Sequence, residues 1–411
     1  IYDYSKDEPI IDVDDNSTPS LNSSLTYKIG LRVGTGAASP PSVYFDNVIV
    51  CTIDDDCDYP EEYFHRKPVI LVPGHGASIN FKEMFLGISD PDGWQMVPGA
   101  HVYDNLLKAF EENGYQKGRD LFVFYYNWLN PIEDSSQKLH DFVNQVVATS
   151  SADKVNLIGH SMGGLVSRGC LEAYGDQCPV ENLITVGSPH RGVPEAYGAW
   201  AGGAIWKRGF INRVAFEIFL NLKKKLGETR RETVLRIAPS TQELLPNFAY
   251  FKNLNENEIP FDKGNYPENN LLSNWHLLSD AKANPYIVYG INQSTLRWLK
   301  IDKELSWWDK VLDNWPYGKP TEREYLLDGD GTVSYLSAYP EASLSGKGFK
   351  MGHRDIILQK EAVGAIMERL GLKPVDFSSF PEDAKNYLVF YLHSPAHLLI
   401  EDEENIAPED I

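Results

Sequence analysis

The chain has 411 residues, of which 42% are hydrophobic and 12% aromatic, and it carries a net charge of −20. This composition is typical of a packed globular protein and excludes a largely disordered chain. The length allows one large domain with appendages, or two domains. No stretch reaches the roughly 18 consecutive apolar residues that would span a bilayer as a helix.

The acidic side chains are concentrated at the two ends of the chain. Residues 1–65 carry 13 acidic and 3 basic side chains, and residues 375–411 carry 9 and 1, which leaves the middle of the chain near −2. Because acidic segments repel phosphate backbones, this distribution argues against a nucleic-acid partner. A nearly neutral middle region suits an apolar ligand.

The first 65 residues predict an acidic linker followed by a short β-region. Residues 1–20 have linker composition, and residues 25–33 and 43–52 alternate like two strands. Two strands are too few for a stable sandwich. We therefore interpret residues 1–65 as a linker with either a β-ribbon or the remnant of a β-sandwich module.

From residue 66 to residue 374, apolar strands alternate with helices, which is the pattern of a mostly parallel sheet with helices on both faces. Between about residues 193 and 284 the alternation breaks down, which predicts a helical lid with an apolar helix face over 211–222. Residues 375–411 predict a C-terminal β-strand tail, or the start of a further β domain. The expected strands are 69–72, 121–126, 155–158, 183–186 and 286–291, and the expected helices are 103–110, 139–147 and 361–370.

The candidate nucleophile is Ser161, in the sequence Gly159-His160-Ser161-Met162-Gly163. A Gly-x-Ser-x-Gly motif between a strand and a helix is a nucleophile elbow, in which the chain turns sharply and holds the serine in a strained backbone conformation. The two glycines are expected because any side chain there would collide with packed neighbours. Residues 155–158 supply the preceding strand, so the context predicts an α/β-hydrolase fold.

A serine nucleophile needs a base and an orienting carboxylate, which in this fold follow in the order Ser, acid, His. Of ten histidines, His353 lies in the loop directly before the last expected helix, where the base belongs. For the acid we prefer Asp330, with Asp328 as the second choice. A calcium loop at this Asp-x-Asp-Gly sequence is the alternative, but the terminal Glu of an EF-hand is absent from its required position.

The oxyanion hole requires two backbone N–H groups that point at the developing negative charge. One is expected from Met162, the residue after the nucleophile. The other is expected from His75, because Gly74 and Gly76 allow the loop after the first strand to approach a ligand.

The four cysteines form two close pairs, Cys51 with Cys57 and Cys170 with Cys178. Neither pair has the clustered ligands of a zinc site, so two disulfides are the preferred interpretation, with buried thiols as the alternative. Disulfides indicate an oxidising compartment, and we expect a secreted or extracytoplasmic protein, including the cell surface. We expect no cofactor and no metal, although calcium binding by the acidic run 54–58 is an alternative.

Five sequence blocks then occur in the order seen in the lecithin:cholesterol acyltransferase-like family, and the resemblance covers about residues 66–373. That family groups lysosomal phospholipase, phospholipid acyltransferases and bacterial relatives. The resemblance implies Ser161, Asp330 and His353 as the catalytic triad and a lipid as substrate. The lid and the loop after the first strand do not match the family's membrane-binding elements. The blocks are Pro73-Gly74-His75-Gly76, Gly159 to Gly164, Ser188-Pro189-His190-Arg191-Gly192, Pro239 to Pro246 and Asp328 to Val333.

The expected function is a serine carboxylic-ester hydrolase of the lipase, phospholipase or esterase type, which works through an acyl-enzyme at Ser161. Its expected partners are a lipid or other hydrophobic ester and, through the lid, a transiently contacted lipid interface. One alternative is an acyltransferase that moves an acyl chain to an alcohol. An alternative from another class is a surface binding protein with an inert hydrolase core.

Overall fold

The computed structural model describes residues 2–3, 8–9, 66–98, 101–150, 152–204, 206 and 220–376. Contacts divide the chain into two units, Ile1–Glu61 and Glu62–Ile411. In the first unit, β1 (Tyr2–Asp3) pairs with β2 (Glu8–Pro9) in antiparallel fashion. The expected terminal strands and the pair Cys51 and Cys57 lie outside the described residues.

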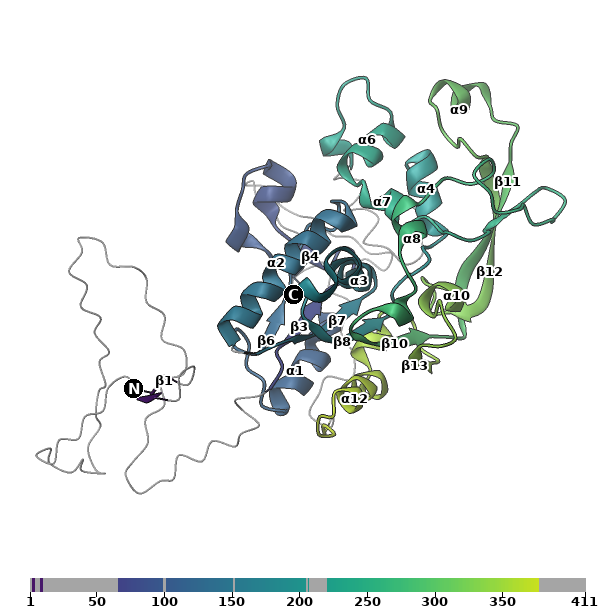
Figure 1. The fold of residues 1–411 in the computed structure, drawn as a ribbon. Helices are drawn as coiled ribbons and strands as arrows, with labels where there is room; N and C mark the ends of the chain where they lie inside the picture. The colour runs from purple at the N-terminus through teal and green to yellow at the C-terminus, as the bar shows by residue number, and fades with distance from the viewer. Residues whose placement is uncertain are drawn as a thin grey trace, which may run out of the picture. The chain divides into compact units, whose positions relative to one another are not determined.

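The second unit is built on a six-stranded sheet whose neighbouring strands are all parallel, in the order β13-β10-β8-β7-β3-β6 (Figure 1). All five expected strands are confirmed, but the strand expected at 121–126 ends at Val123. This strand, β6, lies at the edge of the sheet and pairs only with β3. The last pair joins Val123 to Leu71, and β3 itself ends at Val72, so residues 124–126 have no strand to pair with. The strands are β3 (Val69–Val72), β6 (Leu121–Val123), β7 (Val155–His160), β8 (Val180–Val186), β10 (Asn284–Gly290) and the unexpected β13 (Ser345–Phe349).

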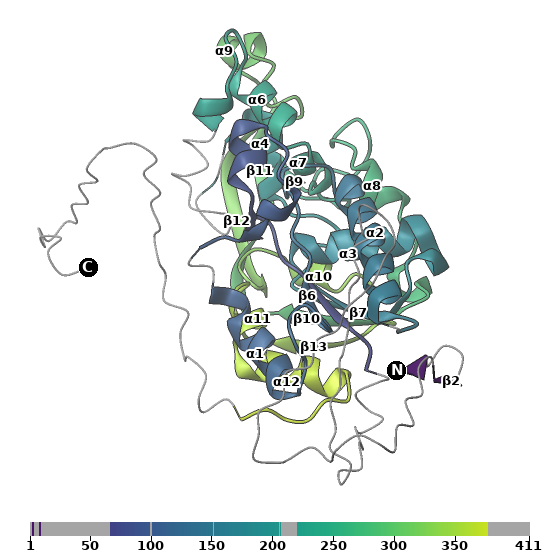
Figure 2. The ribbon, with the colours of Figure 1, turned by 90° about the vertical axis from the view of Figure 1, so that its left-hand side faces the viewer.

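Helices cover both faces of this sheet, as Figures 1 and 2 show. Side chains of a strand alternate between faces, so Ile70 and Val72 of β3 belong to one buried cluster, and Val69 and Leu71 belong to the other. The expected α/β-hydrolase architecture is confirmed. The first cluster contains α2 (Ile132–Ser150) and α3 (Met162–Tyr174), and the second contains α1 (Asp104–Glu112), α11 (Asp355–Leu358) and α12 (Lys360–Arg369).

A second sheet, which the sequence did not predict, has the strand order β12-β11-β9. Its long strands β11 (Gln293–Asp302) and β12 (Lys319–Gly329) are antiparallel, and β9 (Phe251–Lys252) pairs parallel to β11. The connection between the long strands carries α9 (Trp307–Val311), at the outer end of the hairpin in Figure 1. Strand β12 ends one residue before Asp330, so this sheet positions the candidate acid.

The region expected as a lid is irregular and partly helical. Residues 205 and 207–219, which include most of the expected apolar helix face, lie outside the described residues, and residues 220–223 are helical. Besides β9, the described elements are α4 (Glu195–Gly202), α6 (Arg230–Ile237), α7 (Ser240–Glu243), α8 (Asn270–Asn274) and a 3₁₀ turn at Leu278–Asp280.

Shorter elements complete the described part of the second unit. They are β4 (Ser78–Ile79), β5 (Gln95–Met96), α10 (Tyr335–Ala338), a π-helical turn at Lys82–Leu86, and 3₁₀ turns at Pro91–Gly93, His101–Tyr103 and Gly175–Gln177. Among the described residues, no helix combines the length and apolar character needed to cross a bilayer.

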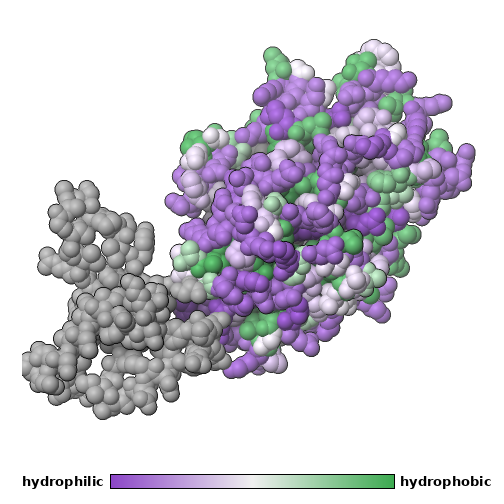
Figure 3. Space-filling model, viewed as in Figure 1, coloured by the Kyte–Doolittle hydropathy of each residue, from purple (hydrophilic) through white to green (hydrophobic). Residues whose placement is uncertain are grey.

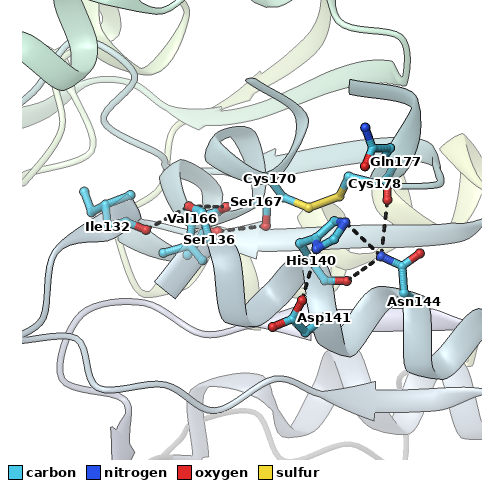
Figure 4. The surroundings of a disulfide bond; sticks show 11 residues. Ile132, Ser136, His140, Asp141, Asn144, Val166, Ser167, Cys170, Gln177 and Cys178 are labelled. Atoms are coloured by element: carbon cyan, nitrogen blue, oxygen red, sulfur yellow. Dashed lines mark hydrogen bonds and ion pairs between the residues drawn. A yellow bond between two sulfur atoms is a disulfide. The ribbon is translucent and has the colours of Figure 1, made fainter. Parts of the chain in front are cut away.

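The expected disulfide between Cys170 and Cys178 is confirmed (Figure 4). Cys170 lies near the end of α3, and Cys178 lies just before β8, so the bond ties the helix that starts at the elbow to the neighbouring strand. Both cysteines are buried. Beside the bond, Asn144 of α2 donates a hydrogen bond to the Gln177 carbonyl at 3.2 Å.

Candidate active site

Ser161 occupies the turn between the fully buried strand β7 and helix α3, with φ 53° and ψ −127°. A positive φ is strained for a residue with a side chain and costs about 1–3 kcal/mol. The expected need for glycine is confirmed by the packing. A Cβ atom on Gly159 would lie 2.5 Å from the Cα of Gly164, and one on Gly163 would lie 2.1 Å from the Val72 carbonyl oxygen.

The structure brings Ser161, His353 and Asp330 into one hydrogen-bonded series. Nε2 of His353 lies 3.0 Å from Ser161 Oγ, and Nδ1 lies 2.7 Å from Asp330 Oδ2. An ionised carboxylate can only accept, so Nδ1 carries the proton and Nε2 presents its lone pair to the Ser161 hydroxyl. Ser161 and Asp330 are 4% and 2% exposed, whereas the His353 side chain between them is 13% exposed, so both ends of the series are buried and the base is partly open to solvent.

Backbone contacts also hold the acid and the base together. The His353 N–H donates to the Asp330 carbonyl at 2.8 Å. The second carboxylate oxygen of Asp330 accepts from the N–H groups of Thr332 and Val333 at 2.8 and 2.6 Å. At the end of β8, a Cβ on Gly187 would lie 3.1 Å from Asp330 Oδ2 and 3.2 Å from His353 Nδ1. The end of the sheet therefore packs directly against both residues.

Asp328, the second choice for the acid, takes a different position. It lies in β12 and is half-buried, and its Oδ1 has no hydrogen-bond partner within the described residues. Burial raises the pKa of Asp328, and the Arg297 charge opposes that rise. The hydrogen bond from His353 goes to Asp330 instead. In the described part of the chain, no group of three or more His, Cys, Asp or Glu side chains could hold a metal ion.

The two residues expected to form the oxyanion hole belong to segments that contact Ser161. Met162 follows the nucleophile and is buried at the start of α3. His75 lies in the loop after β3, where a Cβ on the preceding Gly74 would be 3.0 Å from the Ser161 Cβ. The His75 ring packs against Trp128, with ring centroids 4.3 Å apart. Burial lowers the pKa of His75 to about 3, so its imidazole is neutral near pH 7.

Two residues beside the site were not assigned a role from the sequence. The Tyr103 hydroxyl contacts Gly74 of the loop and Nδ1 of His160, at 2.8 and 2.9 Å. His160, the residue before the nucleophile, also contacts the backbone oxygen of His353 at 3.1 Å through Nε2. In the sequence, the position of His160 inside the elbow motif, directly before Ser161, was the signal that could have pointed to this role. Tyr103 lies in a 3₁₀ turn far from any motif.

Glu195 was also missed. It opens α4, and both its carboxylate oxygens are covered and make no hydrogen bond to another described residue. Burial raises the pKa of Glu195 to about 8, and the charge of Asp330 contributes to the rise. A single Glu in the apolar stretch 193–197 was the only sequence signal.

Residues 95–276 match the family model described as lecithin:cholesterol acyltransferase. That segment contains Ser161 but ends before Asp330 and His353. The resemblance expected from the sequence blocks is therefore confirmed for the part of the chain that carries the elbow.

Similar curated proteins match about a third of the chain. A triacylglycerol lipase of Pseudarthrobacter phenanthrenivorans is 35% identical over 133 residues, which cover 31% of this chain and 34% of that protein. Lecithin-cholesterol acyltransferase-like 4 of Arabidopsis thaliana is 26% identical over 132 residues, which cover 31% of this chain and 24% of that protein. The chain thus spans about a third or less of the length of the curated relatives it matches.

Among solved structures, the mature form of the Bacillus licheniformis lipase BlEst2 is similar to 75% of this chain. The similarity covers 92% of that chain, with 17% sequence identity and a TM-score of 0.37.

Proposed function

We propose that the chain is a serine carboxylic-ester hydrolase of the lipase, phospholipase or esterase type that works through an acyl-enzyme at Ser161. The observation that carries this proposal is the unbroken hydrogen-bonded series from Ser161 through His353 to Asp330, joined to a strained elbow. A buried serine, a base with its lone pair facing that serine and an orienting carboxylate are the components of acyl transfer.

In the proposed reaction, Ser161 Oγ attacks the ester carbonyl while His353 Nε2 accepts the hydroxyl proton. Asp330 keeps the Nδ1 proton in place and stabilises the imidazolium. The N–H groups of Met162 and His75 stabilise the tetrahedral oxyanion. The C–O bond to the leaving alcohol then breaks, and His353 gives that alcohol the proton. Water, deprotonated by His353, finally attacks the acyl-enzyme and releases the acid and free Ser161.

The proposed substrate is a lipid or another hydrophobic ester. Two observations support it: relatives named triacylglycerol lipase match 133 residues of the chain, and the middle of the chain is nearly neutral. The match to the acyltransferase family favours a second candidate, in which an alcohol replaces water in the last step. Product analysis with an alcohol present separates the two, because hydrolysis releases free acid and transfer forms a new ester.

We also propose that the region 193–284 is a lid that contacts a lipid surface transiently. Leu222 and Leu226 are exposed beside Lys224 and Lys225, an arrangement that suits an anionic lipid–water interface. In Figure 3, hydrophobic residues reach the surface at the end of the molecule where Figure 1 places α6 and α9. Because such a surface and a disulfide both suit an extracellular enzyme, we propose that the protein acts outside the cytoplasm.

The decisive test is covalent labelling by a fluorophosphonate, together with hydrolysis of nitrophenyl esters of increasing chain length. We expect wild-type labelling and hydrolysis, and loss of both in Ser161→Ala. The matched control is Ser136→Ala, since Ser136 is equally buried but binds the Ile132 and Val166 carbonyls of two helices. An unlabelled wild-type chain, or esterase activity that persists in Ser161→Ala, would contradict the proposal.

A further inference from the structure

A second series of buried hydrogen bonds, separate from the triad, joins the oxyanion loop to the catalytic base. It runs from the N–H of Gly74 to the Tyr103 hydroxyl at 2.8 Å, and from that hydroxyl to His160 Nδ1 at 2.9 Å. Nε2 of His160 then contacts the carbonyl oxygen of His353 at 3.1 Å. Tyr103 is 1% exposed and His160 is 5% exposed, so the first two bonds are buried, and the third is partly buried.

The direction of every proton in this series follows from its two ends. The His353 carbonyl can only accept, so His160 carries its proton on Nε2 and has a lone pair on Nδ1. The Tyr103 hydroxyl therefore donates to Nδ1, and its oxygen accepts from the Gly74 N–H. This arrangement requires a neutral imidazole, and burial together with the nearby His353 lowers the pKa of His160 to about 3.

The series ends at the loop after β3 and at His353, and catalysis requires that both keep fixed positions relative to Ser161. Gly74 precedes His75, whose N–H is proposed for the oxyanion hole, and the His353 carbonyl belongs to the proposed base. In catalysis, a misplacement of about 1 Å can cost about 100-fold in rate. The contact is close, since a Cβ on Gly74 would lie 3.0 Å from both His160 Nδ1 and the Ser161 Cβ.

We propose that Tyr103 and His160 are positioning residues that hold the oxyanion loop and His353 in register with each other. The proposal rests on the proposed ester hydrolase function. Under this proposal His160, the residue before the nucleophile, contributes to the reaction although neither His160 nor Tyr103 contacts the substrate.

The chain offers a matched control in Tyr126. This tyrosine is also buried, at 2% exposed, and its hydroxyl donates to the Pro73 carbonyl at 2.9 Å. Tyr126 therefore binds the same loop one residue earlier than Tyr103 does. Within the described residues, its hydroxyl makes no further hydrogen bond toward His353. Removal of either hydroxyl costs the fold one buried hydrogen bond to the loop, but only Tyr103 links the loop to the base.

The experiment compares Tyr103→Phe and Tyr126→Phe in kcat and KM for a nitrophenyl ester, and in the rate of fluorophosphonate labelling. We expect Tyr103→Phe to lower kcat and the labelling rate by about 10-fold or more, with KM changed by less than about 3-fold. Tyr126→Phe should lower kcat by less than about 3-fold. Tyr103→Phe loses one hydrogen bond more than Tyr126→Phe, so its melting temperature should fall further. Kinetics at a temperature at which circular dichroism shows both variants folded therefore separates positioning from folding.

A double-mutant cycle tests the link itself. In a His160→Ala background, which already interrupts the series, Tyr103→Phe should lower kcat by less than about 2-fold. His160→Gln retains a donor near the Nε2 position and should recover part of the kcat lost in His160→Ala.

The positioning role would be overturned if the two Phe variants lost kcat equally, or if Tyr103→Phe and His160→Ala acted independently. In either case, labelling of the wild-type chain would leave the hydrolase proposal intact. An unlabelled wild-type chain would overturn both proposals.

Discussion

The two larger sheets of this protein each deliver a catalytic candidate, but the strands that lead to these candidates differ in burial. The strand that precedes Ser161, β7, is buried at every position, whereas β12, which precedes Asp330, is exposed at most positions. The other strand of the hairpin, β11, places Leu296, Leu299 and Ile301 in the buried core, whereas β12 makes contacts nearer the surface, such as the ion pair between Lys252 and Glu324. The nucleophile thus follows a fully buried strand, whereas the acid follows an exposed strand that is anchored to the core through its partner β11.

The largest expected effect concerns the acid at the end of the hairpin. Asp330→Asn should lower kcat by about 10⁴-fold, because the amide favours the wrong His353 tautomer. The matched variant Asp328→Asn, two residues earlier and within β12, should change kcat by less than about 3-fold. Steady-state kinetics with a nitrophenyl ester measures both. Comparable losses in the two variants would show that the hairpin, rather than the Asp330 carboxylate, supplies the effect.

The next effect separates β7 from β12 by their contributions to stability. Leu157→Ala removes a fully buried side chain from β7 and should lower the free energy of unfolding by about 2–5 kcal/mol. Leu327→Ala in β12 removes a side chain that is 69% exposed and should cost less than about 0.5 kcal/mol. Urea denaturation followed by circular dichroism measures both. A similar cost for the two variants would contradict the contrast between the two strands.

The disulfide strengthens the first of these two regions. Reduction, or the double variant Cys170→Ser and Cys178→Ser, should destabilise the fold by about 2–3 kcal/mol, since the bond closes a short loop between α3 and β8. Thermal unfolding with and without reductant measures this loss. If the melting temperature did not change under reductant, the bond would not contribute to stability.

A smaller effect is expected from Glu195, whose pKa is about 8 because of burial and the nearby Asp330. Near pH 4 both the folded and the unfolded state hold the proton. Between about pH 4.5 and pH 8 only the folded state holds it, so stability falls as the pH rises. We expect a loss of order 1–3 kcal/mol from pH 5 to pH 9.

Glu195→Gln should remove this slope, because the amide does not titrate, and melting temperatures across the pH range test it. Glu361→Gln, at an exposed position of α12, is the control and should leave the slope unchanged. A slope that persists in Glu195→Gln would assign the titration to another group.

Much of the site could be predicted from the chain order alone. The elbow is a local feature, and His353 was identified because it precedes the last helix. The hairpin was not predicted, because most residues of β12 are polar and exposed and show no clear apolar alternation. The contact between Tyr103 and His160 joins residues 57 positions apart, and neither residue type signals such a contact.

The sequence by itself determined the parallel sheet, the elbow around Ser161 and the order of the three triad candidates. These features depend on local chemistry: apolar runs that must be buried, and glycines where a Cβ would collide. Only the tertiary structure decided that His353 binds Asp330 rather than Asp328, and that Tyr103 and His160 join the loop to the base. Those choices depend on where the ends of separate strands meet, and that is set by packing between segments distant in the chain.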